Sequence, residues 1–429
     1  MWTPLHRALG LEQSPLSFEL IQRAVEQQVA EAEDLDWKET LPGQDQRATD
    51  DFAKDVAAFL NTGGGLIVYG VAKDRATGQA TELKPVETGE RERLRLRSVA
   101  TDNIHPFPAG FDVVGADDPK TPGHGVVVLV ATRSPEAPHL VGPEDKFGVP
   151  FRDGPSTRWM REPDVERAYR DRFARQADDQ SWLASEVADV AHRLDVQQSI
   201  WLVASARPRI TVPAASSTPT SGDVTVNLQQ ALSDENRLVP HRGAFGRPQL
   251  IRELNSPRVG LRRWMAYPGG GSDLEQLSGD VHIGLHHDGS VTLAAAIARS
   301  MEPVQSDADN VPARLIESFV IEFVSLIQAS ALRGPARRTP YAARLDFLRQ
   351  NQAVPIVLIE NVRVAGMSLP TFEVVADSRP LMNVRPVLVD VFAPDEDSAL
   401  LGSAREIATD VISQFGVSRL VHIPPAGSD

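Results

Sequence analysis

Residues 36–71 constrain the fold more than any other stretch, because an acidic and lysine-bearing segment, a helix, a glycine triplet and an apolar strand follow one another there. Apolar residues recur at helical spacing and predict a helix over about 48–60. Asn61 and Gly63–Gly65 are residues that end helices, and Leu66–Val71 is short, apolar and rich in β-formers. The order predicts a site built at a helix-to-strand turn.

The glycine triplet has two interpretations, a phosphate-binding loop or a closely packed turn. Glycine-rich loops cradle nucleotide phosphates when a Gly-Lys-Ser/Thr sequence follows and a helix comes next. Here no such sequence follows, and the glycines precede a strand. We therefore expect close packing of the backbone at the triplet and no ATP binding.

Composition excludes several classes of protein. The chain has no cysteine, which removes disulfides, thiolate catalysis and cysteine-ligated metals, and favours a cytoplasmic location. Neither an apolar run of about 18 residues nor a basic segment leading into an apolar one is present, so no membrane contact is expected. The net charge of -14 argues against broad adhesion to phosphate backbones, so any nucleic-acid contact requires a local basic patch or a metal site.

The length of 429 residues predicts two or three domains, at roughly 150 residues each. We expect an N-terminal domain over 1–178, a helical arm with a Pro/Ser/Thr-rich linker over 179–223, and a C-terminal α/β domain over 224–429. The fold class is α/β in the broad sense that includes α+β. In the first half we predict helices over 90–99 and 162–194 and a buried strand over 126–130. In the second half we predict a hairpin over 279–296, helices over 311–332 and 400–415, and strands over 354–362 and 384–392.

A histidine cluster in the second half invites a metal hypothesis. His282 and His286 alternate with apolar residues, so they lie on a strand, where four residues span about 13 Å. Two such side chains cannot share one ion, and His287-Asp288-Gly289 fits a hairpin turn. We predict a structural role for the cluster.

Several motifs in the first 175 residues occur in a specific order. They are Leu35-Asp36-Trp37-Lys38, Ala58-Phe59-Leu60-Asn61-Thr62-Gly63-Gly64-Gly65, Tyr69-Gly70-Val71, Asp74, Pro138 and Arg152-Asp153-Gly154-Pro155-Ser156-Thr157-Arg158. Together they resemble the Schlafen AlbA_2 family, described as a DNA-binding module, over about residues 15–175. The resemblance implies a mixed sheet with flanking helices.

In the Schlafen branch of that family, three acidic residues are assigned to metal-dependent cleavage of RNA, chiefly transfer RNA. By motif, the resemblance places these roles on Glu31, Asp36 and Asp74, with Mg²⁺ or Mn²⁺ as the metal. Asp36 stands where the family usually has glutamate, and Asp74 stands beyond the usual place, after Ala72 and Lys73. A shift of one residue in a strand turns a side chain to the other face.

Three hypotheses about function follow from these observations. The first is a metal-dependent endoribonuclease with Glu31, Asp36 and Asp74 as metal ligands. The second is a non-catalytic DNA- or RNA-binding regulator that contacts nucleic acid through Lys38, Arg152 and Arg158. The third is a protein-interaction scaffold, with which the negative net charge is consistent. In each reading the C-terminal domain is expected to regulate, to sense or to form a homo-oligomer.

Overall fold

The structure is a computed structural model. It describes the chain except for residues 1–2, 13, 107, 109, 143–146, 198, 211–218, 241–248, 252–256, 267–280, 298–306, 334–339, 351, 363–370, 393–396 and 426–429. The chain divides into two compact units, Met1–Gln176 (unit 1) and Ala177–Asp429 (unit 2). Among the described residues, no helix is both long and apolar enough to cross a membrane.

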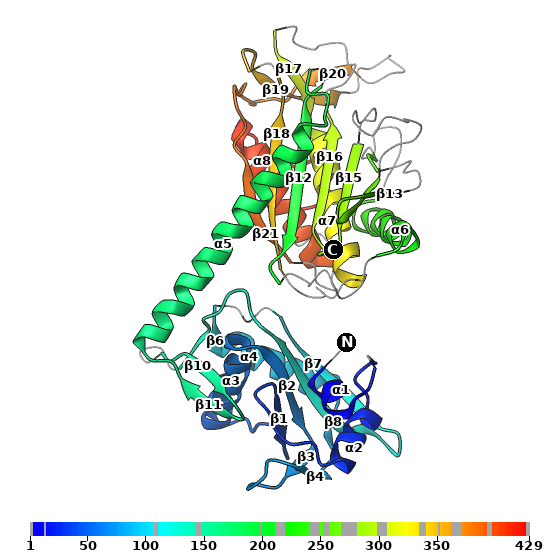
Figure 1. The fold of residues 1–429 in the computed structure, drawn as a ribbon. Coiled ribbons are helices and arrows are strands. Elements are labelled where there is room, and N and C mark those ends of the chain that lie inside the picture. Colours follow the sequence, from blue (N-terminus) through cyan, green and yellow to red (C-terminus); the bar gives the residue numbers. More distant parts are fainter. Residues whose placement is uncertain are drawn as a thin grey trace. The chain divides into compact units, whose positions relative to one another are not determined.

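Unit 1 is built around a mixed sheet (Figure 1). Its elements are α1 (Pro4–Leu9), α2 (Phe18–Glu26), β1 (Leu35–Lys38), α3 (Gln46–Asn61), β2 (Gly64–Tyr69), β3 (Val71–Lys73), β4 (Ala80–Leu83), β5 (Val86–Glu87), α4 (Glu90–Asn103), β6 (Ile104–His105), β7 (Phe111–Asp118), β8 (Thr121–Thr132), β9 (Leu140–Val141), β10 (Pro150–Asp153), β11 (Ser156–Trp159) and the first half of α5 (Glu162–Ala191). The strand order is β1-β2-β8-β5, with β7 also paired to β8. β1 is parallel to β2, and β8 is antiparallel to its neighbours, which confirms the predicted mixed sheet with flanking helices.

Helices cover both faces of this sheet because its strands alternate apolar side chains on two sides. On one face, α3 and α4 pack against β2 and β8 through Phe52, Phe59 and Leu96. On the other face, α1 and α2 pack against β1, β2 and β8 around Ile21 and the fully buried Trp37. Each face therefore has its own core, and the sheet lies between them.

The backbone is closely packed at the turn from α3 into β2. Gly64 has φ +81° and Gly65 has φ +147°, a region that favours glycine. A Cβ on Gly65 would lie 2.3 Å from the carbonyl oxygen of Asp34, and one on Gly64 would lie 2.6 Å from that of Ala131. The expected close backbone packing at the triplet is thus confirmed, because side chains at these positions would separate β2 from its neighbours.

Unit 2 contains the second half of α5 and a second, antiparallel sheet in the order β13-β14-β15-β16-β12-β18-β21. Its elements are β12 (Trp201–Pro208), α6 (Ser221–Leu238), β13 (Arg258–Gly260), β14 (Arg263–Ala266), β15 (Val281–His286), β16 (Val291–Ala296), β17 (Asp309–Pro312), α7 (Ala313–Arg333), β18 (Tyr341–Leu348), β19 (Ile356–Val362), β20 (Thr371–Val374), β21 (Val387–Val391), α8 (Asp397–Ile412) and the 3₁₀ helix η1 (Ser413–Phe415). β17, β19 and β20 form a smaller sheet. The strands and helices predicted for this half are present, with small differences at their ends.

The antiparallel sheet of unit 2 has a large core on the side of α6, α7 and α8, where Phe319, Phe323 and Leu400 are buried. Its other face packs against the second half of α5 through Val187 and Val190. The predicted arm and linker, 179–223, overlaps this sheet, because β12 is an inner strand between β16 and β18. The strand was not predicted, because its short apolar sequence Trp-Leu-Val is adjacent to a stretch rich in proline and serine, whose composition is typical of a linker.

The histidine cluster lies on the α5 side of this sheet. His286 Nε2 is 3.3 Å from Glu186 Oε1, and the His286 ring contacts Trp182 edge-on. His282 is buried, which lowers its pKa to about 4, so it remains neutral in the interior. These contacts, between β15 and α5, agree with the predicted structural role.

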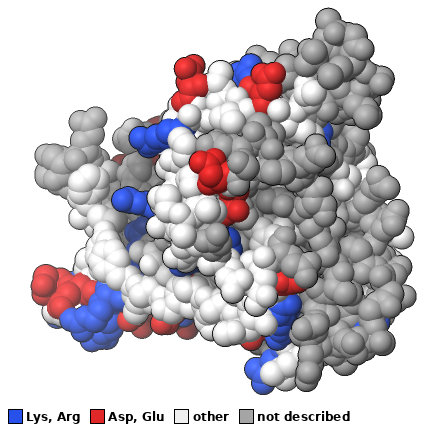
Figure 2. All heavy atoms as spheres, turned by 90° about the horizontal axis from the view of Figure 1, so that it is seen from above, with Lys and Arg blue, Asp and Glu red and all other residues white. Residues whose placement is uncertain are grey.

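Charged side chains are mixed in sign over the described part of the face drawn in Figure 2, where Lys/Arg and Asp/Glu residues are scattered among uncharged ones. That face shows no broad basic area within the residues described. On this face, any contact with phosphates must therefore come from a more local group of cations.

Candidate functional site

The edge strand β1 places two polar side chains on the α3 face of the sheet. Leu35 and Trp37 enter the core on the opposite face, so strand alternation directs Asp36 and Lys38 toward α3. In the parallel register Asp36 is opposite Ile67 and Lys38 is opposite Tyr69, and both partners belong to the core beneath α3. Because side chains alternate along this four-residue strand, the carboxylate of Asp36 and the ammonium group of Lys38 both lie on the α3 face of the sheet.

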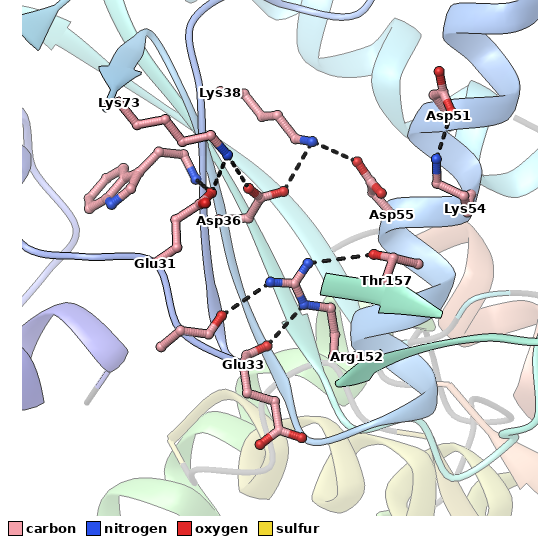
Figure 3. Close-up of polar contacts among 12 residues, drawn as sticks. Glu31, Glu33, Asp36, Lys38, Asp51, Lys54, Asp55, Lys73, Arg152 and Thr157 are labelled. Carbon is pink, nitrogen blue, oxygen red and sulfur yellow. Dashed lines mark hydrogen bonds and ion pairs between the residues drawn. The ribbon is translucent and has the colours of Figure 1, made fainter. Parts of the chain in front are cut away.

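Three other residues complete an acid–lysine cluster, which consists of Glu31, Asp36, Lys38, Asp55 and Lys73 (Figure 3). Lys38 Nζ lies 3.1 Å from Asp36 Oδ2 and 2.8 Å from Asp55 Oδ2 on α3. Lys73 Nζ, from β3, lies 2.5 Å from Glu31 Oε1 and 3.3 Å from Asp36 Oδ1. Carboxylates and ammonium groups thus alternate along one short chain of contacts.

The main chain holds Glu31 in this cluster. Its Oε1 accepts a hydrogen bond of 2.9 Å from the backbone N–H of Trp37, and its own N–H donates to the carbonyl of Gly78 at 3.0 Å. Trp37 Nε1 in turn donates to the Val29 carbonyl at 3.0 Å, which fixes the loop that precedes β1. Glu31 is thereby positioned five residues before Asp36 but directly beside it.

Burial and mutual contact set the protonation of the two acids. Burial and a hydrogen bond with Asp36 raise the pKa of Glu31 to about 7, although the hydrogen bond from Lys73 lowers it. Burial disfavours the charge of Asp36, but the hydrogen bond from Glu31 and the charges of Lys38 and Lys73 hold its pKa below the usual value. Of the two carboxyl groups, Glu31 is therefore the one that takes up a proton first as the pH falls, and Asp36 keeps the negative charge.

The lysines respond in the opposite sense. Burial opposes the charge of Lys38, but Asp55 and Asp36 raise its pKa above the ordinary value. The two ammonium groups balance the carboxylates of Asp36 and Asp55, and the raised pKa of Glu31 reduces its negative charge near neutral pH. The cluster is accordingly close to neutral where three carboxyl groups alone would be strongly negative.

Asp74 lies in a turn of its own. Its Oδ1 accepts hydrogen bonds from the backbone N–H groups of Ala76 and Thr77, at 2.9 and 2.8 Å, and from the Thr77 hydroxyl at 3.0 Å. These contacts lower the pKa of this exposed carboxyl. The structure thus brings Glu31 and Asp36 together and places Asp74 elsewhere, because a register shift between Ala72 and Lys73 turns the Lys73 side chain inward.

The donors present do not fit a resident Mg²⁺ or Mn²⁺ ion. Among the described residues, no group of three His, Cys, Asp or Glu side chains is arranged to hold a metal. The position between Glu31 and Asp36 is taken by the ammonium of Lys73, which supplies the positive charge that a divalent ion would otherwise provide. A metal could enter only by displacing that ammonium group.

The two arginines expected to contact nucleic acid have different surroundings. Arg152 is buried, donates to the carbonyls of Ala32 and Glu33 at 3.1 and 3.2 Å, and lies over the Phe59 ring at 4.7 Å. It anchors the acidic loop before β1 and presents no free guanidinium. Arg158 is exposed and pairs with Asp153 at 2.9 Å within the β10–β11 hairpin.

Sequence reasoning missed Asp55 and Lys73. The signal for Asp55 was a carboxylate on the apolar face of α3, between Phe52 and Phe59, where an unpaired charge is costly. For Lys73 the signal was weaker, because its direction depends on the irregular pairing of β3 with β4. Neither residue belongs to a motif quoted for the family.

Comparison with known proteins assigns the region that carries this cluster. Residues 31–161 match the family model "Schlafen, AlbA_2", so unit 1 contains a Schlafen AlbA_2 domain, and the resemblance seen in the sequence is confirmed. The assignment points to a function related to nucleic acid. No curated protein matches the chain.

One solved structure, that of the DIP2311 protein from Corynebacterium diphtheriae, is similar to part of the chain. The identity is 17%, and the match covers 53% of this chain and 38% of that protein, with a TM-score of 0.23. At that score the similarity supports no conclusion about fold or function.

Proposed function

We propose that unit 1 binds nucleic acid as a non-catalytic regulator, with an acid–lysine cluster that needs no metal ion. The family supports the nucleic-acid ligand. The observation that carries the non-catalytic reading is the Lys73 ammonium between Glu31 and Asp36, at 2.5 and 3.3 Å. An internal cation fills the place that hydrolysis by a metal-activated water would require.

The cluster is suited to shaping a binding surface. The side chains of Lys38 and Lys73 are 35% and 31% exposed, whereas those of Asp36 and Glu31 are 6% and 10% exposed. The ammonium groups therefore meet solvent while the carboxylates beneath them hold them in place. A phosphate approaching this edge would meet cations first.

A second candidate is the metal-dependent endoribonuclease acting on transfer RNA or another structured RNA. It is favoured by the direct contact between the carboxyl groups of Glu31 and Asp36, since paired carboxylates suit Mg²⁺ or Mn²⁺. For this candidate, RNA with Mn²⁺ would have to displace Lys73.

Incubation of the full chain with transfer RNA and with single-stranded DNA separates these candidates. The proposed regulator binds at low salt, leaves the strands intact, and binds equally well with Mn²⁺ or with a chelator. Cleavage that requires Mn²⁺ and is lost in Asp36→Asn would establish the nuclease instead. An Asp51→Asn variant, which loses an exposed carboxylate on α3, controls for the change of charge.

Absence of binding even at low salt would contradict both candidates and leave the scaffold reading. The role of unit 2 in regulation, sensing or homo-oligomer formation stays a prediction.

A further inference from the structure

A second polar site lies in unit 1, and none of the residues that line it belongs to the acid–lysine cluster. It is a cavity of about 260 Å³ where the end of α3, the end of β8, the β10–β11 hairpin and the first half of α5 meet. We call it the arginine pocket. The residues that decide its chemistry are Arg133, Phe151, Asp164, Arg167, Asp171 and Arg175.

Three arginines, Arg133, Arg167 and Arg175, line this one cavity together. Some exposed arginines of unit 1 pair with carboxylates, as Arg158 does with Asp153 and Arg170 with Glu166, and others, such as Arg23 and Arg91, make no ion pair with a described residue but do not line this pocket. Arg133 and Arg167 are exposed, and among the described residues neither makes an ion pair or a side-chain hydrogen bond. Guanidinium groups without partners that converge on one cavity are a signal for an anionic ligand.

Arg175 adds charge from deeper in the pocket. Its hydrogen bonds to the carbonyls of Pro135 and Ala137 are both 3.4 Å long, which is near the limit for such a contact. Burial and the nearby charge of Arg133 lower its pKa, although the carboxylates of Asp171 and Glu136 act in the opposite direction, so the two guanidinium groups repel each other. An anion between them would relieve that repulsion.

The remaining lining restricts the kind of anion. Asp164 and Asp171 offer carboxylates that accept hydrogen bonds, and Phe151 offers an aromatic ring. A bare inorganic anion uses neither of these, whereas a nucleotide has a phosphate, hydroxyl or amino donors, and a base that packs on an aromatic ring. The cavity lies below the roughly 300–1,000 Å³ usual for larger ligands, so it suits a single nucleotide unit.

We propose that the arginine pocket binds one nucleotide unit of a single-stranded nucleic acid, with its phosphate at Arg133, Arg167 and Arg175. The inference deepens the proposed function and rests on it. A single strand is required because a paired and stacked base could not reach the carboxylates and the ring at the same time as the phosphate reaches the arginines.

The test measures the binding of a labelled short single-stranded RNA and of the matching duplex to the full chain, by fluorescence anisotropy at several salt concentrations. Arg133→Gln combined with Arg167→Gln should weaken single-strand binding at least about tenfold. The slope of log affinity against log salt should fall by about 0.7 for a lost phosphate contact. Adenosine monophosphate should compete with the strand, and adenosine should not.

Two further variants separate the pocket from general charge effects. Arg23→Gln combined with Arg170→Gln removes equal charge from exposed positions outside the pocket, and should leave binding near that of the parent. Asp171→Asn removes a negative charge that opposes the phosphate, while its amide oxygen can still accept a hydrogen bond from the nucleotide. Binding should therefore tighten, a direction that misfolding would not produce.

The outcomes are distinct. If both double variants weaken binding equally, the proposed role of the pocket is wrong, although nucleic-acid binding itself stands. The same holds if neither Asp171→Asn nor Arg133→Gln/Arg167→Gln changes binding. A parent that binds neither RNA nor the mononucleotide at low salt would overturn the proposed function and the pocket together.

Discussion

Replacing Lys73 by Met removes the internal cation while keeping a side chain of similar length. The substitution leaves Glu31 and Asp36 facing each other, without the contacts of 2.5 and 3.3 Å that join them to the ammonium. Because the hydrogen bond from Lys73 lowers the pKa of Glu31, that pKa rises above its present value of about 7 in the variant. The penalty of the substitution therefore depends on pH.

The burial of the pair sets the magnitude. An exposed ion pair contributes up to about 1 kcal/mol, and breaking a buried one costs about 3–5 kcal/mol. The Lys73 side chain is 31% exposed and that of Glu31 is 10% exposed, so we expect a loss of about 1–2 kcal/mol at pH 8, where Glu31 is ionised in the parent. At pH 5 Glu31 is protonated, Lys73 retains only its contact with Asp36, and the loss falls to about 0.5 kcal/mol.

Urea unfolding of the parent and of Lys73→Met at the two pH values measures this difference. Lys54→Met is the matched control, since Lys54 pairs with an exposed Asp51 and should cost under about 1 kcal/mol at both pH values. Mn²⁺ should raise the melting temperature of Lys73→Met and not that of the parent, because a divalent ion can replace the missing ammonium. Equal losses at pH 5 and pH 8, or a parent stabilised by Mn²⁺ as much as the variant, would refute this account.

Three other substitutions test the surroundings of the cluster. The pKa of Glu31 is raised from 4.5 to about 7, so its contribution to stability is fully present below about pH 4.5 and is lost as the pH rises through about 7. In Glu31→Gln, the free energy of unfolding in urea should therefore change less between these two pH values than it does in the parent. Gly65→Ala should cost about 3 kcal/mol or more in urea unfolding, because its Cβ would meet the Asp34 carbonyl at a positive φ. Arg152→Gln should cost about 1–3 kcal/mol by removing a buried guanidinium together with its hydrogen bonds to the carbonyls of Ala32 and Glu33, and a parent-like midpoint would contradict its anchoring role.

The elements of unit 1 were predictable where the signal is local. The periodicity of 48–60, the glycines after it and the apolar run of 66–71 predicted α3, the sharp turn and β2 in the right order. The family resemblance added the mixed sheet, because its motifs occur at the points where that sheet turns. β12 was missed, since its apolar run is short and lies next to a proline- and serine-rich stretch.

The site was predictable only in part, because most of its contacts join residues far apart in the chain. Asp36 and Lys38 share a face by strand alternation, which is a local rule. The contact of Lys38 with Asp55 and that of Lys73 with Glu31 depend on how α3 and β3 pack, which spacing does not encode. The arginine pocket likewise assembles from four separate elements.

The identity of the residue before Asp74 decides what this cluster can do. The irregular pairing of β3 with β4 directs Lys73, and not Asp74, toward the two carboxyl groups. A third carboxylate there would make the site strongly negative and dependent on a metal, whereas an ammonium makes it nearly neutral and self-contained. A neutral site exerts little attraction on phosphate, so strong binding of nucleic acid must draw on cations that are not already paired. In unit 1 the arginine pocket provides such a group, and for this reason substitutions there should affect affinity more than substitutions in the cluster.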